Sequence, residues 1–155
     1  MKRALVIGCS GQDGSLISKS LLKKGFEVFG TSRNPKNTIH NHLSLKISNN
    51  VQLEELDICN MNSIAKLIQK IAPSEIYHLA AETSVGLSFN KPNQSFDSIC
   101  RSTNALLEAS KNINFDGKLF FAGSSEIFGN TKYKANLNYT VDPKSPYAIA
   151  KIARM

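Results

Sequence analysis

Residues 2–14 read Lys2-Arg3-Ala4-Leu5-Val6-Ile7-Gly8-Cys9-Ser10-Gly11-Gln12-Asp13-Gly14, and this stretch decides the fold. Its first half is a short apolar run typical of a buried strand, and its second half has the spacing G-x-x-G-x-x-G. Glycines allow a tight turn and let backbone N–H groups approach a diphosphate, while the following helix presents its positive end to the same anion. The order of strand, glycine turn and helix therefore predicts a dinucleotide-binding fold.

The helix after this turn has an apolar stripe of Leu16, Ile17, Leu21 and Leu22. It is expected to end at Lys23-Lys24-Gly25, because glycine favours the C-terminal stop and the helix dipole favours lysines beside it.

The strand Glu27–Thr31 comes next and indicates which dinucleotide is bound. NAD-specific sites place a carboxylate at the end of this strand to bind the ribose 2′-hydroxyl. Here the strand end reads Thr31-Ser32-Arg33-Asn34, and Arg33 can form charge-assisted hydrogen bonds with a 2′-phosphate. The sequence therefore favours NADP, the alternative being that Arg33 is a solvated loop cation.

Strands and helices alternate along the rest of the chain, which predicts a doubly wound, Rossmann-like α/β fold with a parallel sheet. The segments expected, in order, are a polar loop 34–50, a strand 51–56, a helix capped by Asn60 with Ile64, Leu67, Ile68 and Ile71 buried, a strand 75–81, a helix with Phe96, Ile99, Cys100, Thr103, Leu106 and Leu107 on one side, and a strand 118–122. Ligands bind at the carboxyl ends of such strands. The glycine turn, Arg33, Asp57, Ala80-Ala81 and Ser124 are therefore expected to form one site.

Composition and charge fit a single enzyme-like domain. The chain has 155 residues, of which 41% are hydrophobic, and a net charge of +7. A chain of this length and composition can bury one hydrophobic core of ordinary size. The basic residues are scattered without interleaved aromatics, so nucleic acid is not expected and phosphate-bearing ligands explain the charge.

Cysteine and histidine usage points to neither disulfides nor a metal site. Cys9, Cys59 and Cys100 are widely separated, so neither a disulfide framework nor a zinc site is expected, and a reducing cytoplasm is the natural setting. His40-Asn41-His42 lacks a third ligand nearby and is expected to be loop rather than metal site. No signal peptide or membrane-spanning stretch is expected.

A second motif lies near the end of the chain. Ala122-Gly123-Ser124-Ser125-Glu126 is followed by Ser145-Pro146-Tyr147-Ala148-Ile149-Ala150-Lys151. A tyrosine and a lysine at i and i+4 share one helix face, so the ammonium can stabilise a phenolate that acts as a general base. The alternative is a surface pair without catalytic role.

Together these motifs resemble the extended short-chain dehydrogenase/reductase superfamily, and within it the GDP-mannose 4,6-dehydratase family, from Met1 to Lys151. The resemblance implies that catalysis is carried by Ser124, Glu126, Tyr147 and Lys151. It implies that NADP is bound by Gly8, Ser10, Gly11, Gln12, Asp13, Gly14, Arg33, Asp57, Ile58, Leu79, Ala80, Ala81, Thr83, Tyr147 and Lys151, and that no metal is needed.

The resemblance also implies a mechanism, a redox-neutral dehydration of GDP-mannose in which Glu126 removes the C5 proton. An epimerase of the superfamily needs no such base. Three alternatives stay open: a GDP-4-keto-6-deoxymannose reductase, another NAD(P)-dependent nucleotide-sugar epimerase or dehydratase, and a non-catalytic nucleotide-binding fragment.

The family's members are considerably longer, are homo-oligomers, and carry a sugar-nucleotide domain after the Tyr-Lys helix. Residues 1–155 are thus expected to be an incomplete NADP-binding Rossmann domain without that C-terminal substrate domain, with weak NADP binding and little or no turnover.

Overall fold

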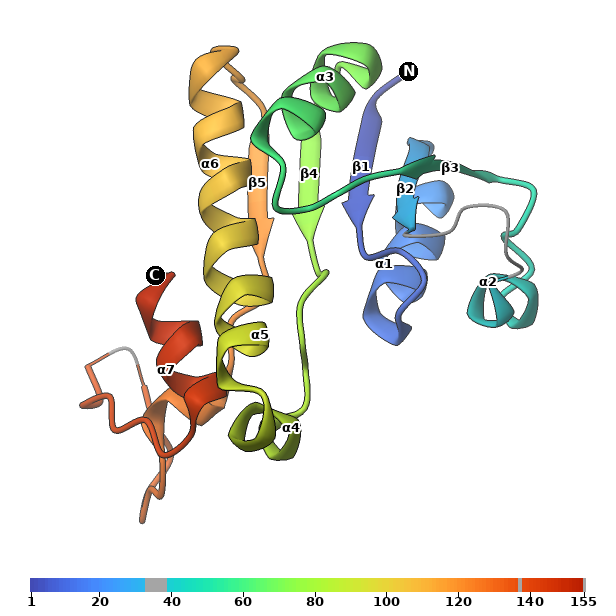
Figure 1. Cartoon of the computed structure of the whole chain (residues 1–155). Coiled ribbons are helices and arrows are strands. Elements are labelled where there is room, and N and C mark those ends of the chain that lie inside the picture. The colour runs from blue at the N-terminus through green and yellow to red at the C-terminus, as the bar shows by residue number, and fades with distance from the viewer. Residues whose placement is uncertain (33–38, 137, 155) are drawn as a thin grey trace. The chain divides into compact units, whose positions relative to one another are not determined.

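The computed structural model describes residues 1–32, 39–136 and 138–154 (Figure 1). By their internal contacts these residues form two compact units. The sheet unit consists of Met1–Ala80 and Ala105–Ala122, and the helical unit consists of Ala81–Asn104 and Gly123–Met155.

The sheet unit contains five parallel strands in the order β3-β2-β1-β4-β5. Their bounds are Arg3–Ile7 for β1, Glu27–Ser32 for β2, Val51–Glu55 for β3, Glu75–His78 for β4 and Lys118–Phe121 for β5. Strand order reverses direction at β1, which pairs with β2 on one side and with β4 on the other. This is the predicted doubly wound Rossmann-like sheet, with the carboxyl ends of all strands along one edge.

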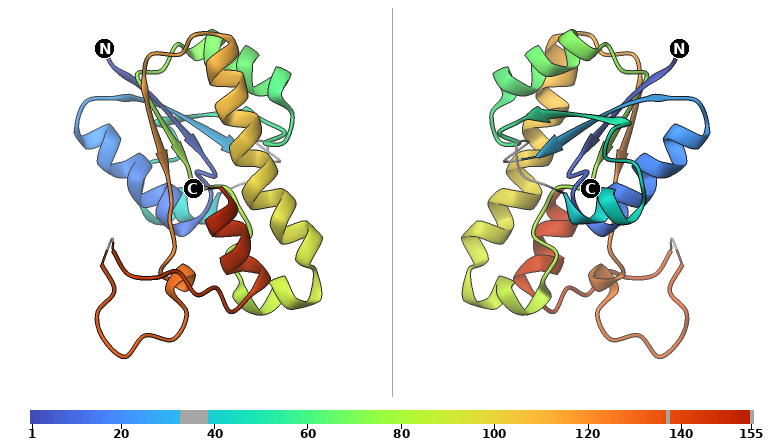
Figure 2. Two further views of the ribbon diagram at one scale, coloured as in Figure 1. Left: turned by 90° about the vertical axis from the view of Figure 1, so that its left-hand side faces the viewer. Right: turned by 90° about the vertical axis from the view of Figure 1, so that its right-hand side faces the viewer.

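Helices cover both faces of this sheet, as Figure 2 shows. Leu5 and Ile7 of β1 point to the face covered by α3 (Met61–Ile71) and by α6 (Ser102–Asn112), which enters the sheet unit at Ala105. Ala4 and Val6 point to the opposite face, where they pack with Leu21 of α1 (Gln12–Lys23). Because β1 is buried on both faces, its sequence is a continuous apolar run rather than an alternation of apolar and polar residues.

The predicted helix 61–71 is confirmed in detail. Asn60 caps it by accepting a hydrogen bond from the Ser63 N–H at 3.0 Å, and the four predicted apolar positions, Ile64, Leu67, Ile68 and Ile71, are all buried. The predicted stop at Gly25 is also confirmed, since this residue has a φ of +78°.

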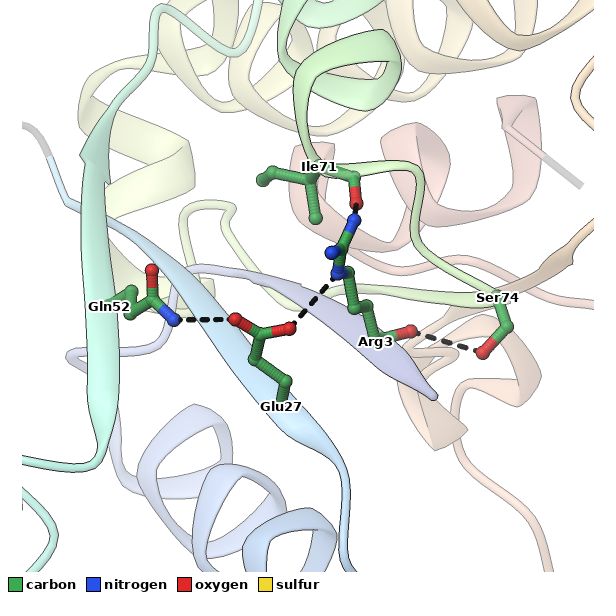
Figure 3. A network of polar contacts seen from close by, with 5 residues as sticks. All are labelled: Arg3, Glu27, Gln52, Ile71 and Ser74. Carbon is green, nitrogen blue, oxygen red and sulfur yellow. Dashed lines mark hydrogen bonds and ion pairs between the residues drawn. The ribbon is translucent and has the colours of Figure 1, made fainter. Parts of the chain in front are cut away.

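A polar network ties the amino ends of three neighbouring strands together (Figure 3). The Arg3 guanidinium donates to Glu27 at 3.0 Å and to the Ile71 carbonyl at 2.9 Å. Gln52 donates to the second oxygen of Glu27 at 2.9 Å. The hydrogen bonds from Gln52 and Arg3 lower the pKa of Glu27. Glu27 thus lies at the end of β2 opposite to the glycine turn.

The expected polar loop 34–50 is wrong over its second part, because His40–Ser44 form the short helix α2. Its neighbours Ile39, Leu45 and Ile47 pack into the apolar cluster around Cys9 and Val51. The burial of these three apolar side chains holds the segment in place, and the mostly polar composition of the segment gave no sign of it. Residues 33–38 lie outside the described part of the chain.

The predicted strand 75–81 is too long, because β4 ends at His78. Leu79 still donates its N–H to the Ile7 carbonyl at 2.9 Å, but β1 ends at Ile7 and the chain turns at Gly8. Leu79, Ala80 and Ala81 therefore lie beyond the strand.

The helical unit contains α4 (Val85–Asn90), α5 (Pro92–Phe96), the π-helical turn η1 (Asp97–Arg101), the 3₁₀ turn η2 (Ser125–Phe128) and α7 (Pro146–Ala153). The single apolar side predicted for residues 96–107 is wrong at its two ends, where Phe96 is 44% and Leu107 is 43% exposed. A π turn bonds residues i and i+5 and rotates the helix face relative to a regular α-helix. Among the described helices, none is long and apolar enough to cross a membrane.

We predict that Gly14→Ala destabilises the protein by about 1–3 kcal/mol, because overpacking of a rigid site costs this much. A Cβ atom at Gly14 would lie 2.8 Å from the Cys9 Cα and would overlap the Gly8 carbonyl. The matched control is Gly86→Ala in α4, where the nearest atom is the Ser84 Oγ at 3.9 Å. Urea denaturation should find the control as stable as the wild type or more so. Equal stabilities of the two variants would contradict this packing.

Candidate functional site

The glycine turn joins β1 to α1 in a conformation that requires glycine at its first position. Gly8 has a φ of +88°, and a Cβ atom there would lie 2.7 Å from the backbone nitrogen of Ala80. The Gly8 carbonyl accepts the Gly11 N–H at 3.3 Å, and the Gly8 N–H donates to the Thr31 Oγ at 3.3 Å. The turn therefore passes directly over the end of β4.

The amino end of α1 is suited to an anion. Its N-cap is Gly11, and within the described residues no side chain caps the first turn. Ser10, Gly11, Gln12 and Asp13 are exposed. Uncapped N–H groups carry the positive end of the helix dipole, so the turn and the helix start fit a diphosphate. Burial raises the pKa of the Cys9 thiol to about 12, which keeps this thiol protonated at neutral pH.

Other predicted cofactor residues of the sheet unit lie at the same carboxyl edge. Asp57 and Ile58 follow β3, where the Asp57 carboxylate accepts the Cys59 N–H at 3.0 Å and Ile58 packs against the core. Leu79 and Ala80 follow β4, and Ala80 contacts the glycine turn. Arg33, the predicted 2′-phosphate ligand, lies outside the described residues.

The helical unit brings Tyr147 and Lys151 together on α7. Ser145 caps this helix by accepting the Ala148 N–H at 3.0 Å, and Pro146 occupies its first position. Tyr147 is 8% and Lys151 is 5% exposed, and the Lys151 Nζ lies 5.4 Å from the centre of the Tyr147 ring. A surface pair would be solvated, so this burial argues against the alternative that the two residues are incidental.

Burial also changes the protonation of the lysine. Desolvation, with a smaller contribution from the Arg154 charge, lowers the pKa of Lys151 from 10.5 to about 8. A lysine with such a pKa exchanges protons close to physiological pH. A lowered lysine pKa next to a tyrosine is typical of a functional site.

Glu126 lies on the turn η2, Ser124 caps the amino end of this turn, and α7 packs against it. The Ser124 Oγ accepts the Glu126 N–H at 3.3 Å, and the Glu126 side chain is exposed. The hydroxyl of Ser124 can form a hydrogen bond with a substrate oxygen, and the exposed carboxylate of Glu126 can remove a proton. Ala81 packs in the small core with Tyr147, and Thr83 is exposed.

Sequence reasoning missed the local role of Glu82. Its carboxylate accepts the N–H groups of Thr83 and Ser84, both at 2.9 Å, and its own N–H donates to the Ser98 Oγ at 3.1 Å. These bonds fix the loop that carries Ala81 and Thr83. The only signal in the sequence is an acidic residue just before the helix cap Ser84.

Comparisons with known proteins agree on the kind of protein this chain is similar to. The family model described as GDP-mannose 4,6 dehydratase matches residues 5–155. GDP-mannose 4,6 dehydratase 1 of Arabidopsis thaliana is 37% identical over 163 aligned positions, which cover 98% of this chain and 45% of that protein. The chain thus spans less than half the length of this curated relative.

Solved structures of similar fold include two UDP-glucose 4-epimerases. The enzyme of Stenotrophomonas maltophila, solved with bound NAD, superposes with a TM-score of 0.86 at 26% identity, covering 98% of this chain and 46% of that one. The enzyme of Thermus thermophilus, solved as a complex with NAD, gives a TM-score of 0.84 at 27% identity, covering 98% of this chain and 48% of that one.

We predict that Lys151→Met raises the free energy of unfolding at pH 7 by about 1–2 kcal/mol, because it removes a buried charge. Between pH 8 and 10.5 the unfolded chain keeps the lysine proton while the folded chain releases it. Wild-type stability therefore rises with pH relative to the variant, and the difference should shrink by about pH 9.5. Thermal denaturation at both pH values, with the exposed Lys66→Met as control, measures this. A difference that does not depend on pH would contradict it.

Proposed function

The chain belongs to the GDP-mannose 4,6-dehydratase family, and from this membership we propose that it supplies the cofactor-binding turn and the catalytic side chains for converting GDP-mannose to GDP-4-keto-6-deoxymannose with NADP. The observation that carries the proposal is the buried pair of Tyr147 and Lys151, in the same compact unit as Ser124 and Glu126. A cytoplasmic setting and a homo-oligomeric full-length enzyme belong to the same proposal.

The glycine turn and the start of α1 would hold the diphosphate of NADP. The cradle is narrow, because a side chain at Gly8 or Gly14 would meet backbone atoms. In the described part of the chain no side chain caps the first turn of α1, so its N–H groups are available to an anion. Asp57 and Ile58 would contact the adenine, and Arg33 the 2′-phosphate. When bound, NADP supplies the means to oxidise the sugar at C4 and later to reduce it at C6.

Tyr147 would act as the base for the sugar 4-hydroxyl and take its proton through the phenolic oxygen. Lys151, buried beside the ring, would stabilise the phenolate. Ser124, held on η2 by the hydrogen bond to Glu126, would donate to the same sugar oxygen and keep it oriented.

Glu126 would remove the proton at C5, which the ketone at C4 makes acidic. The hydroxyl at C6 takes up a proton from the protonated Glu126 and leaves as water, and C5 is protonated again from groups that exchange with solvent once C6 has been reduced. This step separates a dehydratase from a 4-epimerase, which inverts C4 and needs no base at C5. The exposed carboxylate of Glu126, two residues after Ser124 on the same turn, supports this assignment.

The choice of NADP over NAD rests on Arg33. We predict that Arg33→Ala weakens binding of NADP⁺ about tenfold and leaves binding of NAD⁺ within about twofold, because charge-assisted hydrogen bonds to a phosphate are lost. Isothermal titration calorimetry with both cofactors measures this, with Lys23→Ala on α1 as the control cation. Tighter binding of NAD⁺ than of NADP⁺ by the wild type would overturn the assignment.

The second experiment tests the reaction itself. Incubation of the purified chain with NADP⁺ and GDP-mannose, followed by mass spectrometry, should give a small amount of a product lighter by one water, with no net reduced cofactor. Glu126→Gln and Tyr147→Phe should each lower its formation by at least about a hundredfold, while Glu108→Gln, an exposed carboxylate on α6, should not.

Two outcomes of this experiment contradict the proposal. In a parallel incubation with NADPH and GDP-4-keto-6-deoxymannose, net oxidation of NADPH would identify a reductase. NADP⁺ affinity and product formation that are the same in the wild type, Glu126→Gln and Tyr147→Phe would identify a nucleotide-binding module without catalysis.

A further inference from the structure

Two consecutive side chains of helix α2 form hydrogen bonds with backbone carbonyls of the glycine turn. The His42 Nε2 lies 2.9 Å from the Cys9 carbonyl oxygen, and the Asn41 amide donates to the Ser10 carbonyl at 2.9 Å. A carbonyl only accepts, so the His42 bond requires a proton on Nε2. Two adjacent carbonyls of the turn are thereby fixed by a segment that follows it by some thirty residues.

The position of α2 is itself well determined. His42 is only 2% exposed. Ile39 before the helix and Ile47 after it pack into the same apolar cluster as Cys9. The helix ends before Lys46, which has a φ of 58°, and the Ile47 N–H bonds back to the His42 carbonyl at 2.9 Å. Because both ends of α2 are anchored, its side chains act on the turn as a fixed support.

The Cys9 carbonyl has a second donor in α1. The Ser15 hydroxyl donates to it at 2.8 Å. This oxygen is thus held between α1 and α2, both of which belong to the sheet unit, while the Ser10 carbonyl is held by α2.

The direction of these carbonyls decides what the turn offers to an anion. In a trans peptide the C=O and the following N–H point in opposite directions. Fixing the Cys9 carbonyl toward α2 therefore directs the Ser10 N–H away from α2. The Ser10 carbonyl, bound by Asn41, fixes the peptide whose Gly11 N–H closes the turn on the Gly8 carbonyl at 3.3 Å. A carbonyl oxygen released from its donor could rotate toward a bound diphosphate and repel it.

We propose that Asn41 and His42 are positioning residues that preorganise the glycine turn for the diphosphate of a dinucleotide. The proposal rests on the proposed function, because it assumes that the turn binds such a cofactor. Neither side chain touches the cofactor. They act through the backbone of Cys9 and Ser10, and so set the affinity for the diphosphate without affecting the affinity for the adenosine end.

The test compares two ligands in several variants of the whole chain. His42→Leu keeps an apolar side chain of fitting size in the buried site but removes the donor, and we expect it to weaken NADP⁺ binding about fivefold to tenfold. His42→Gln retains a donor at the end of its side chain and is expected to restore affinity to within about twofold of the wild type. The probe 2′-AMP, which lacks the diphosphate, should bind the wild type and both variants with equal affinity.

Asn41→Ala provides an independent variant, because Asn41 is exposed and its replacement does not disturb the core. It should weaken NADP⁺ binding about threefold, again without effect on 2′-AMP. This variant decides the question if His42→Leu does not fold.

Two results would overturn the proposal, and they differ from failure of the proposed function. Equal NADP⁺ affinity of the wild type, His42→Leu and Asn41→Ala would show that the turn needs no support from α2. Equal weakening of NADP⁺ and 2′-AMP would show that α2 supports only the general fold. A wild-type chain that binds no NADP⁺ at all would instead refute the proposed function, and this inference with it.

Discussion

The close approach of α1 to the end of β1 is the constraint on which the rest of the sheet unit depends. Gly14 lets the helix backbone come against the Gly8 carbonyl and the Cys9 Cα, and Gly8 lets the turn pass over Ala80. Once this contact is made, β1 is the central strand with helices on both of its faces. The uncapped amino end of α1 then lies at the carboxyl edge of the sheet, where a diphosphate can bind. Packing and ligand binding thus depend on the same glycines.

The helical unit depends on a different balance, between burial and charge. Tyr147 and Ala150 anchor α7 against Ile99, and the Cys100 thiol donates to the Ala150 carbonyl at 3.1 Å. This packing places Lys151 where water hardly reaches it, which lowers its pKa to about 8. Burying an ammonium costs stability. In the proposed mechanism this buried group has a chemical role, because it stabilises the phenolate of Tyr147.

Much of the fold could be predicted from the sequence, because periodicity reports burial directly. The strand before Gly8 and the helix with Ile64, Leu67 and Ile68 followed from local pattern alone. Helix α2 could not be predicted, since its five residues are mostly polar and it is held by tertiary contacts of His42 and Ile47. The exposed positions of Phe96 and Leu107 could not be predicted either, because the π turn between them leaves no mark in apolar spacing. For the candidate site, the spacing of Tyr147 and Lys151 was readable, whereas the burial of the lysine depends on segments distant in sequence.

In the proposed mechanism, Glu126 acts as a base at C5 and the cofactor ends each turnover unchanged. Reaction of GDP-mannose with the chain and NADP⁺ in heavy water tests this most directly. The proposed mechanism predicts a dehydrated product that carries deuterium at C5, because the proton removed there leaves with the water and C5 is protonated again from groups that exchange with solvent. It also predicts no net change in the amount of reduced cofactor. A dehydrated product without deuterium at C5, or one formed equally well by Glu126→Gln, would contradict the account.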